Sequence, residues 1–419
     1  MMDLHTYKIS SKMWSYVASG GVAGSGDSVV SESQAYSLLM TGIILASWDS
    51  QASGTQSETQ RQEVIDAFEA YFNGWKKMCQ ISSAPCQSDK MCQAEDETIS
   101  ICLPDWKFDA QLSSVQGTGS APDADEDAIT GMMLAVKAVE NDSTKPTWYD
   151  EVRKWADASA TSFMKHDTNG EFPGKVLVKL GSCWGGWGAD GNNPSYHAPG
   201  QYKLFAQYQA EFPSNDRVGY TAADSNEWSM LINTSHEVLR AVQCPSQGIV
   251  PNWARVDLDS SNSVVIDAGS FSGSGTPQYE FGAEASRTIY RVAMDLAMYP
   301  TADPVTTDAY TFLGPMISTL EQTYSSSGWQ NGDFGSCSVT GMCQSITMFG
   351  DWVNNGFIYG PMFSSLIGGS PSSQALDVAA AKLAALPVPT SYYPRSWVLL
   401  SNLMLNGAVE DSGRLVRGV

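Results

Sequence analysis

Three acidic clusters stand out in this sequence because each comes where a helix is expected to begin. Glu32 directly precedes an apolar stretch, Asp123 opens a run with four carboxylates over 123–127, and Glu284 is followed three residues later by Arg287. A carboxylate in such a cluster can hydrogen-bond a ligand or shift the pKa of a neighbouring carboxyl group. The clusters are therefore candidates for acid–base chemistry.

Each cluster also has a purely structural interpretation. The dipole of a helix favours a first-turn carboxylate such as Glu32, and Asp123 or Asp125 could serve as a helix N-cap. Glu284 and Arg287 have the spacing of a common surface ion pair. Spacing alone does not separate these alternatives.

Hydrophobic periodicity predicts the elements that would carry these clusters. We expect few strands and one all-α domain over 1–419, built as a ring of antiparallel helical hairpins with its long loops forming a groove at one end. An open helical solenoid is the alternative, although no repeat of fixed period is visible. The predicted helices are 34–49, 61–78, 126–140, 148–165, 199–212, 225–243, 284–298, 304–324, 356–367, 373–385 and 392–406, and the long loops are 20–31, 80–125, 167–198, 244–282 and 325–345.

Charge and composition exclude several classes of function. The chain has 45 Asp and Glu against 24 Lys and Arg, a formal charge of −21, so it should repel nucleic acid and anionic membranes. Its longest apolar stretch, 38–48, is too short to span a bilayer. Only 16% of the residues are charged, which suits a protein that works outside the cell. We expect neither a nucleic acid nor a membrane as partner, and a monomer.

Eight cysteines, an even number, favour disulfides over a metal site. Their spacings are wider than those of zinc ligands and the four histidines are scattered, so no metal is expected. Disulfides imply a secreted protein, and because the N-terminus does not resemble an export signal, we expect such a signal to have been removed. Four cysteines lie in one loop (Cys79, Cys86, Cys92 and Cys102), Cys337 and Cys343 form a second local candidate pair, and Cys183 and Cys244 are left as a long-range pair.

Several motifs, taken in order, resemble glycoside hydrolase family 8, which contains bacterial endoglucanases, xylanases, lichenases and chitosanases. The resemblance spans nearly the whole chain and implies an (α/α)6 barrel with a polysaccharide-binding groove across one end. The motifs are Ser31–Ser37 (like SEGQAYG), Trp106-Lys107, Ala121–Asp125 (like ASDAD), Asn193–Tyr196, Gly248–Trp253 (like GLVPDW), Ala283–Arg291 and Tyr392-Tyr393.

The resemblance also implies roles for individual residues. Glu32 matches the general acid, Asp123 the carboxylate that holds the distorted sugar, and Glu284 the catalytic base. The substrate-binding set comprises Arg287 and Tyr196, which match residues that position the attacking water, Trp106, which matches an aromatic sugar platform, and Tyr36 of the Glu32 motif.

Two tryptophans in a glycine-rich loop, Trp184 and Trp187, are further candidates for sugar stacking. One departure from the family pattern bears on the chemistry. The base is usually Asp, and the extra methylene of Glu284 would displace its carboxylate by about an ångström, a shift large enough to affect the rate. Either the groove has adjusted, or another carboxylate such as Asp125 or Asp127 activates the water.

The predicted function is an inverting, endo-acting hydrolase of a β-1,4-linked polysaccharide, with cellulose or β-glucan as first choice. Xylan is the second choice and chitosan the third. A different class of function is a catalytically impaired, carbohydrate-binding descendant, suggested by the altered base. Hydrolysis needs only carboxylates and water, so no cofactor is expected.

Overall fold

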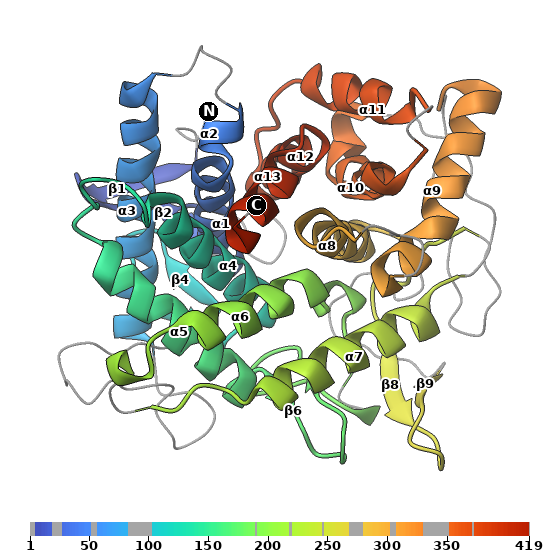
Figure 1. Ribbon diagram of the computed structural model, residues 1–419, viewed down its shortest axis with the longest axis horizontal. Helices are drawn as coiled ribbons and strands as arrows, with labels where there is room; N and C mark the ends of the chain where they lie inside the picture. Colours follow the sequence, from blue (N-terminus) through green and yellow to red (C-terminus); the bar gives the residue numbers. More distant parts are fainter. Residues whose placement is uncertain are drawn as a thin grey trace.

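Six helices form a closed inner ring in the computed structural model (Figure 1). Each packs on the next in chain order, and the last packs on the first. They are α1 (Ser31–Ala46), α4 (Pro122–Val139), α6 (Pro199–Glu211), α8 (Ala283–Met298), α10 (Trp352–Phe363) and α12 (Tyr392–Leu405). The structure describes residues 5–18, 27–51, 57–82, 103–188, 191–217, 220–244, 247–267, 280–301, 307–329, 352–370 and 373–418.

A second set of helices follows the inner ones and covers them. Figure 1 shows α3, α5, α7, α9 and α11 around the outside of the ring. Each packs against the inner helix that precedes it, so the chain runs as a series of antiparallel hairpins. These helices are α3 (Glu58–Ile81), α5 (Tyr149–His166), α7 (Ser225–Val242), α9 (Asp308–Ser327) and α11 (Ala375–Ala384).

The last helix, α13 (Ala408–Arg417), lies across one end of the ring. The Ser412 hydroxyl donates to the carbonyl of Ile43, near the end of α1, and Gly413 packs against Met298 at the end of α8. Because the C-terminal ends of α1 and α8 meet α13, their N-terminal ends face the opposite end of the ring. That end carries the acidic clusters.

Close packing between α1 and α4 brings two of these clusters together. The helices cross at Gly42 and Gly131, where a Cβ on Gly42 would lie 2.5 Å from the carbonyl oxygen of Gly131. Only glycine permits such an approach. The crossing therefore fixes Glu32, in the first turn of α1, beside Asp123, in the first turn of α4.

Short strands join the helices at this end. β3 (Ser28–Val30), β4 (Lys107–Asp109) and β5 (Val115–Gly117) form a three-stranded sheet, and β3 leads directly into α1. The Ser31 amide donates to the Trp106 carbonyl at 2.9 Å, so the sheet places Trp106 beside the start of α1. The remaining two-stranded pairs are β1 (Thr6–Ser10) with β2 (Met13–Tyr16), β6 (Thr168–Asn169) with β7 (Leu177–Val178), and β8 (Arg255–Leu258) with β9 (Val264–Asp267).

All eleven predicted helices are present, and the closed ring rules out an open solenoid. The prediction missed α13 and the short α2 (Trp48–Gln51), and the segment predicted as 356–367 is α10 followed by the 3-10 helix η6 (Ser364–Gly368). Asp123 and Asp125 are not N-caps, because α4 begins at Pro122 with Ala121 as the cap.

Candidate active site

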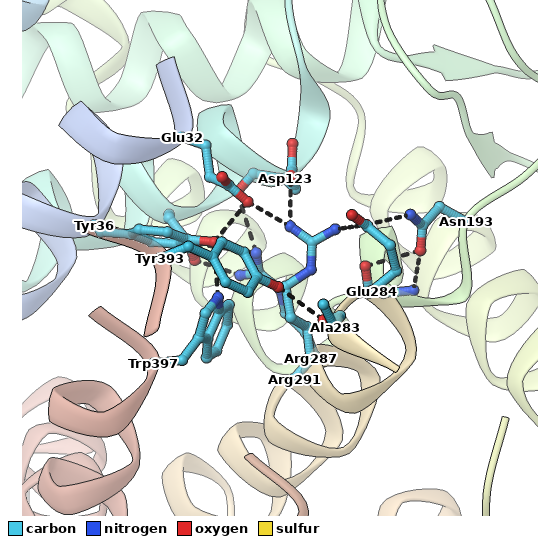
Figure 2. A network of polar contacts seen from close by, with 12 residues as sticks. Glu32, Tyr36, Asp123, Asn193, Ala283, Glu284, Arg287, Arg291, Tyr393 and Trp397 are labelled. Carbon is cyan, nitrogen blue, oxygen red and sulfur yellow. Dashed lines mark hydrogen bonds and ion pairs between the residues drawn. The ribbon is translucent and has the colours of Figure 1, made fainter. Parts of the chain in front are cut away.

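One arginine joins the three predicted catalytic carboxylates, which come from the first turns of three inner helices (Figure 2). Nη1 of Arg287 donates to Oε1 of Glu32 at 2.6 Å and to Oδ2 of Asp123 at 2.7 Å. Nη2 donates to Oε2 of Glu284. Glu32 and Glu284 thus lie on different nitrogens of one guanidinium, with Arg287 between them.

The guanidinium of Arg287 is only 2% exposed and stays charged. Burial alone would lower its pKa, but the neighbouring carboxylates, Glu284 first among them, raise it well above the usual value. The ring of Tyr196 faces the guanidinium, 5.7 Å from its carbon. This ring belongs to the 3-10 helix η3 (Pro194–Tyr196), so the loop before α6 covers one side of the cluster.

Glu32 has the protonation behaviour of a general acid. Burial, together with the charges of Asp123 and Glu284, raises its pKa to about 7 against the lowering effects of Arg287 and Tyr36. A carboxyl group with this pKa is substantially protonated at neutral pH. Its side chain remains 14% exposed, so the proton can be delivered outside the protein core.

Hydroxyl groups hold the Glu32 carboxylate from two sides. Tyr36, one turn further along α1, donates to Oε1 at 2.6 Å, and Tyr392 from α12 donates to Oε2 at 3.1 Å. Trp397 in turn donates its indole N–H to the Tyr36 hydroxyl at 2.9 Å. The acid is thereby fixed in one orientation by residues from both ends of the chain.

Glu284 is the most exposed of the three carboxylates, with 24% of its side chain accessible. Asn193 donates to its Oε2 at 2.9 Å, so this oxygen receives two hydrogen bonds, counting that from Arg287. Among the residues that the structure describes, none donates to Oε1. One oxygen is held and the other is available to a water molecule.

The helix that carries Glu284 is itself anchored by a loop and by helix α12. Oδ1 of Asn252, in the Gly248–Trp253 motif, accepts from the amides of Gly282 at 3.2 Å and Ala285 at 3.0 Å, which caps α8 from outside the helix. The Tyr393 hydroxyl donates to the Ala283 carbonyl at 2.7 Å. The first turn of α8 therefore has little freedom to shift.

The other carboxylates of the 123–127 run point away from the site into the core. Asp127 pairs with Arg291, one turn below Arg287, and Glu126 accepts from the Tyr202 hydroxyl at 2.6 Å. Asp125 hydrogen-bonds Asp167. Asp125 and Asp127 are fully buried, so the expectation that either could serve as an alternative base is wrong.

The predicted substrate-binding aromatics divide into two groups. Trp106 is half-buried against Gly117, and Trp184 is 40% exposed, lying across Gly119 and Gly181. Trp187 is only 7% exposed and packs edge-on against Phe172, which leaves little of its indole for a sugar. Tyr36 is fully buried beneath Glu32, so it positions the acid and does not contact a ligand.

Sequence reasoning missed several partners of the predicted catalytic carboxylates. Asn193 and Tyr392 belong to motifs that were recognised, but nothing in their spacing indicated hydrogen bonds to Glu284 and Glu32. Asn252 likewise gave no local sign that it caps α8. Trp397 is buried in the core and lies 361 residues from Tyr36, to whose hydroxyl it donates.

Other predictions concern cysteines, metals and membranes. Cys183 and Cys244 are both disulfide-bonded. Within the described ranges, no group of histidine, cysteine, aspartate or glutamate side chains is suited to hold a metal ion, and no helix has the length and apolar character to cross a bilayer. Of the other six cysteines, Cys79 is described and is buried near the end of α3, whereas the rest lie outside the described residues: Cys86, Cys92, Cys102, Cys337 and Cys343.

The fold and this site together define a glycoside hydrolase built on an (α/α)6 barrel. The sequence profile described as "Glycosyl hydrolases family 8" matches residues 92–331, more than half of the chain. The chain therefore belongs to glycoside hydrolase family 8. Glu32 and Tyr392 lie outside the matched segment. In the structure Tyr392 donates to Glu32, and Glu32 accepts from Arg287, which also binds Asp123 inside the segment.

The curated relatives are distant in sequence. The chain is 26% identical to Endoglucanase 2 of Ruminiclostridium josui and 24% identical to Endoglucanase C of Ruminiclostridium cellulolyticum, in both cases over 210 residues. These matches cover 48% of this chain and only 36% of each relative.

Solved structures match over much more of the chain. A β-1,3-1,4-glucanase from Paenibacillus sp. X4 superposes with a TM-score of 0.66 at 18% identity, covering 96% of this chain and 88% of that protein. Rex8A from Paenibacillus barcinonensis, in complex with xylose, gives a TM-score of 0.60 at 15% identity, covering 97% and 88%. At these identities the likeness shows the fold, and the predicted (α/α)6 barrel is confirmed.

Proposed function

We propose that this chain is an inverting, endo-acting hydrolase of β-1,4-linked glucan, with Glu32 as general acid and Glu284 as general base. The observation that carries the proposal is the Arg287 bridge. Arg287 pairs with both carboxyl groups and lies between them. The pKa of Glu32 is raised to about 7, whereas Glu284 is the more exposed of the two. Inverting glycosidases need this division of roles, with two carboxyl groups far enough apart to admit a water molecule.

On the leaving-group side of the proposed single displacement, Glu32 protonates the glycosidic oxygen as the bond from that oxygen to the anomeric carbon breaks. The proton comes from a carboxyl group that burial keeps protonated near neutral pH. Tyr36 and Tyr392 hold the carboxyl group while it loses the proton, and their hydroxyls stabilise the resulting carboxylate.

In the same displacement, water attacks the anomeric carbon from the opposite face as the glycosidic bond breaks, and gives its proton to Oε1 of Glu284. Oε2 is held by Asn193 and Arg287, which leaves Oε1 to act as the base. Asp123 places negative charge beside the same cluster, where a sugar ring with oxocarbenium character would develop positive charge. The product has the opposite anomeric configuration from the bond that was cut.

The choice of glucan rests on the named relatives, two of which are endoglucanases. Xylan is the second candidate and chitosan the third. The half-buried Trp106 and the exposed Trp184 support binding of a polymer, because indole rings stack on sugar faces. We also propose a secreted, extracellular setting, supported by the disulfides at Cys183 and Cys244.

The proposal is tested by measuring reducing-sugar release from carboxymethylcellulose, mixed-linkage β-glucan, β-1,4-xylan and chitosan. Wild type, Glu32→Gln and Glu284→Gln are compared, with Asp66→Asn on the outer helix α3 as a surface control. We expect cleavage of a glucan, a rapid fall in viscosity that marks endo action, and an α-anomeric product seen by proton NMR. Both catalytic variants should lose at least about a hundredfold in rate, while the control keeps its rate.

Other outcomes would change the assignment in different ways. Cleavage of xylan or chitosan alone would replace the substrate and leave the mechanism. A β-anomeric product would rule out inversion. Binding without cleavage of any of the four polymers would support a carbohydrate-binding descendant and remove the catalytic roles of Glu32 and Glu284.

A further inference from the structure

Asn193 is a fully buried amide that contacts a predicted catalytic group. It precedes η3, at the end of the glycine-rich loop that leads to α6. Its Nδ2 donates to Oε2 of Glu284 at 2.9 Å, across 91 residues of sequence (Figure 2). The contact therefore depends on the fold and is not a local turn.

The orientation of this amide is set by its other end. Oδ1 of Asn193 accepts from the amide of Ser195 at 2.9 Å and from the Ser195 hydroxyl at 2.8 Å. A flipped amide would point its NH2 group at the backbone N–H of Ser195, which can only donate. The carboxamide is consequently locked with its NH2 group toward Glu284.

A locked donor matters more for a glutamate than for an aspartate at this position. Glu284 has one more rotatable bond than the residue usual in the family, so its carboxylate has more positions to sample. Arg287 alone would allow the carboxylate to turn around a single ion pair. A second donor on the same oxygen removes that freedom and directs Oε1 away from both donors.

We propose that Asn193 is a positioning residue that fixes Glu284 as the base. The inference rests on the proposed function, because it assigns Asn193 a role only if Glu284 activates water. It predicts that losing the donor lowers the rate of the chemical step and leaves substrate binding nearly intact.

The isosteric change Asn193→Asp separates this role from a structural one. Aspartate keeps the oxygen that accepts from Ser195, and it is as good a cap as asparagine. It replaces the NH2 group facing Glu284 by a second acceptor. Because Asn193 is fully buried, the added carboxylate should lower stability whatever the role of the residue. A purely structural Asn193 should nevertheless keep its kcat per folded molecule, whereas a positioning Asn193 should lose it.

We expect Asn193→Asp to lower kcat by about 10- to 100-fold with KM changed by less than about threefold, as for loss of a hydrogen bond to a charged group. The acid limb of the kcat/KM profile should move to higher pH, because a base that loses a donor and gains an anionic neighbour takes up a proton more easily. The thermal midpoint is measured alongside, and kcat is expressed per folded molecule so that the stability lost to the buried charge is not counted as a loss of rate.

A second variant, Asn193→Ser, keeps the test decisive if the aspartate variant fails to fold. Serine also caps the Ser195 amide, but its short hydroxyl does not reach Glu284. We expect a similar loss of kcat with a smaller shift of the acid limb, because no charge is added. Wild-type kcat and an unmoved profile in either folded variant would overturn the inference.

Glu284→Gln, assayed in parallel, distinguishes failure of this inference from failure of the proposed function. If Glu284→Gln is active, Glu284 is not the base and the proposed mechanism falls first. If Glu284→Gln is inactive while Asn193→Asp and Asn193→Ser are both unimpaired, the mechanism stands and only the role of Asn193 is rejected.

Discussion

The Tyr36 hydroxyl donates a 2.6 Å hydrogen bond to Oε1 of Glu32 and accepts one of 2.9 Å from the indole of Trp397. The tyrosine lies one turn below the acid on α1 and is fully buried. It therefore links the protonation of the acid to the packing between the first and last inner helices. Changes at Tyr36 should affect both the pH profile and stability.

Replacing Tyr36 by Phe should move the basic limb of the activity profile to higher pH. The hydrogen bond lowers the pKa of Glu32, so its loss raises that pKa and keeps the acid protonated further into the alkaline range. The Trp397 N–H loses its partner in the core, which should reduce the free energy of unfolding by about 1–3 kcal/mol. Profiles of kcat/KM against pH and urea unfolding measure the two effects.

Tyr71→Phe is the matched control for this prediction. Tyr71 is an equally buried tyrosine on α3, and its hydroxyl is bonded to Thr6. Removing it should cost stability without moving either limb of the profile. An unchanged basic limb in Tyr36→Phe would contradict the proposed link between Tyr36 and the acid.

Glu32 itself should make the folded protein less stable as pH rises. Its pKa is raised from 4.5 to about 7, so between these values the folded state binds a proton that the unfolded state has released. The free energy of unfolding then falls with increasing pH through this window. Glu32→Gln should stabilise the protein at pH 8 by on the order of 2 kcal/mol and have little effect at pH 4. Thermal melting at both values tests this, and equal effects at the two pH values would refute it.

The elements that sequence could predict are those with a strong local signal. The 3.6-residue pattern located the inner helices, whereas α13 was missed although it closes one end of the ring, and its sequence contains Gly413 in mid-helix. The run at 123–127 was recognised as the start of a helix. The alternative in which Asp123 or Asp125 is its N-cap is wrong because the helix begins at Pro122, and the side chain of Asp123 accepts from Arg287 of α8.

The same difference between local sequence signals and long-range contacts applies to the candidate site. Motif order identified Glu32, Asp123 and Glu284, because each lies in a recognisable stretch of sequence. Their supporting partners come from far along the chain: Tyr392 lies 360 residues from Glu32. Burial also follows from tertiary packing, which is why Trp184 and Trp187, only three residues apart, could not be told apart by sequence.

The buried carboxyl pair Asp125 and Asp167 should give a second pH dependence of stability. Burial is the main cause that raises the pKa of Asp167, from 3.8 to about 6, and its hydrogen bond to Asp125 requires a proton on one of the two groups. Stability should therefore be lost as pH rises from about 4 through 6. Asp125→Asn supplies an amide donor in place of that proton, so its thermal midpoint should vary less over this range.

The contribution of Glu32 overlaps with this window and has to be removed. Comparing Glu32→Gln with the double variant Glu32→Gln/Asp125→Asn isolates the buried pair. We expect the double variant to have the flatter dependence of thermal midpoint on pH from 4 to 8. If both curves have the same slope, the pair does not share a proton in this range.

Two arginines one turn apart on α8 should differ in whether their loss abolishes turnover. Arg291 pairs with the fully buried Asp127, so Arg291→Met leaves a charge in the core and should cost about 3–5 kcal/mol of unfolding free energy. Arg287→Met leaves the partly exposed Glu32 and Glu284 and the buried Asp123 without their common partner, so it should abolish turnover as well as lower stability.

Chemical denaturation and turnover per folded molecule, measured on the same preparations, test this contrast. Arg291→Met should retain turnover wherever it remains folded, since its guanidinium does not contact Glu32 or Glu284. Loss of turnover in folded Arg291→Met would mean that the buried ion pair with Asp127 also sets the geometry of the site. Full turnover in Arg287→Met would remove the basis of the proposed mechanism.

The two loop tryptophans give the last contrast, between binding and packing. Trp184 is 40% exposed and lies across Gly119, where a Cβ would come within 2.5 Å of the indole, whereas Trp187 is 7% exposed against Phe172. In a Glu32→Gln background, Trp184→Ala should weaken retention in a polysaccharide-containing gel by about tenfold in Kd, with its thermal midpoint unchanged. Trp187→Ala should lower the unfolding free energy by about 3–5 kcal/mol, because it empties a packed site.

If Trp184→Ala binds as tightly as its parent, the exposed indole of Trp184 does not contact the bound polymer. The sugar-stacking role would then be left to Trp106 alone.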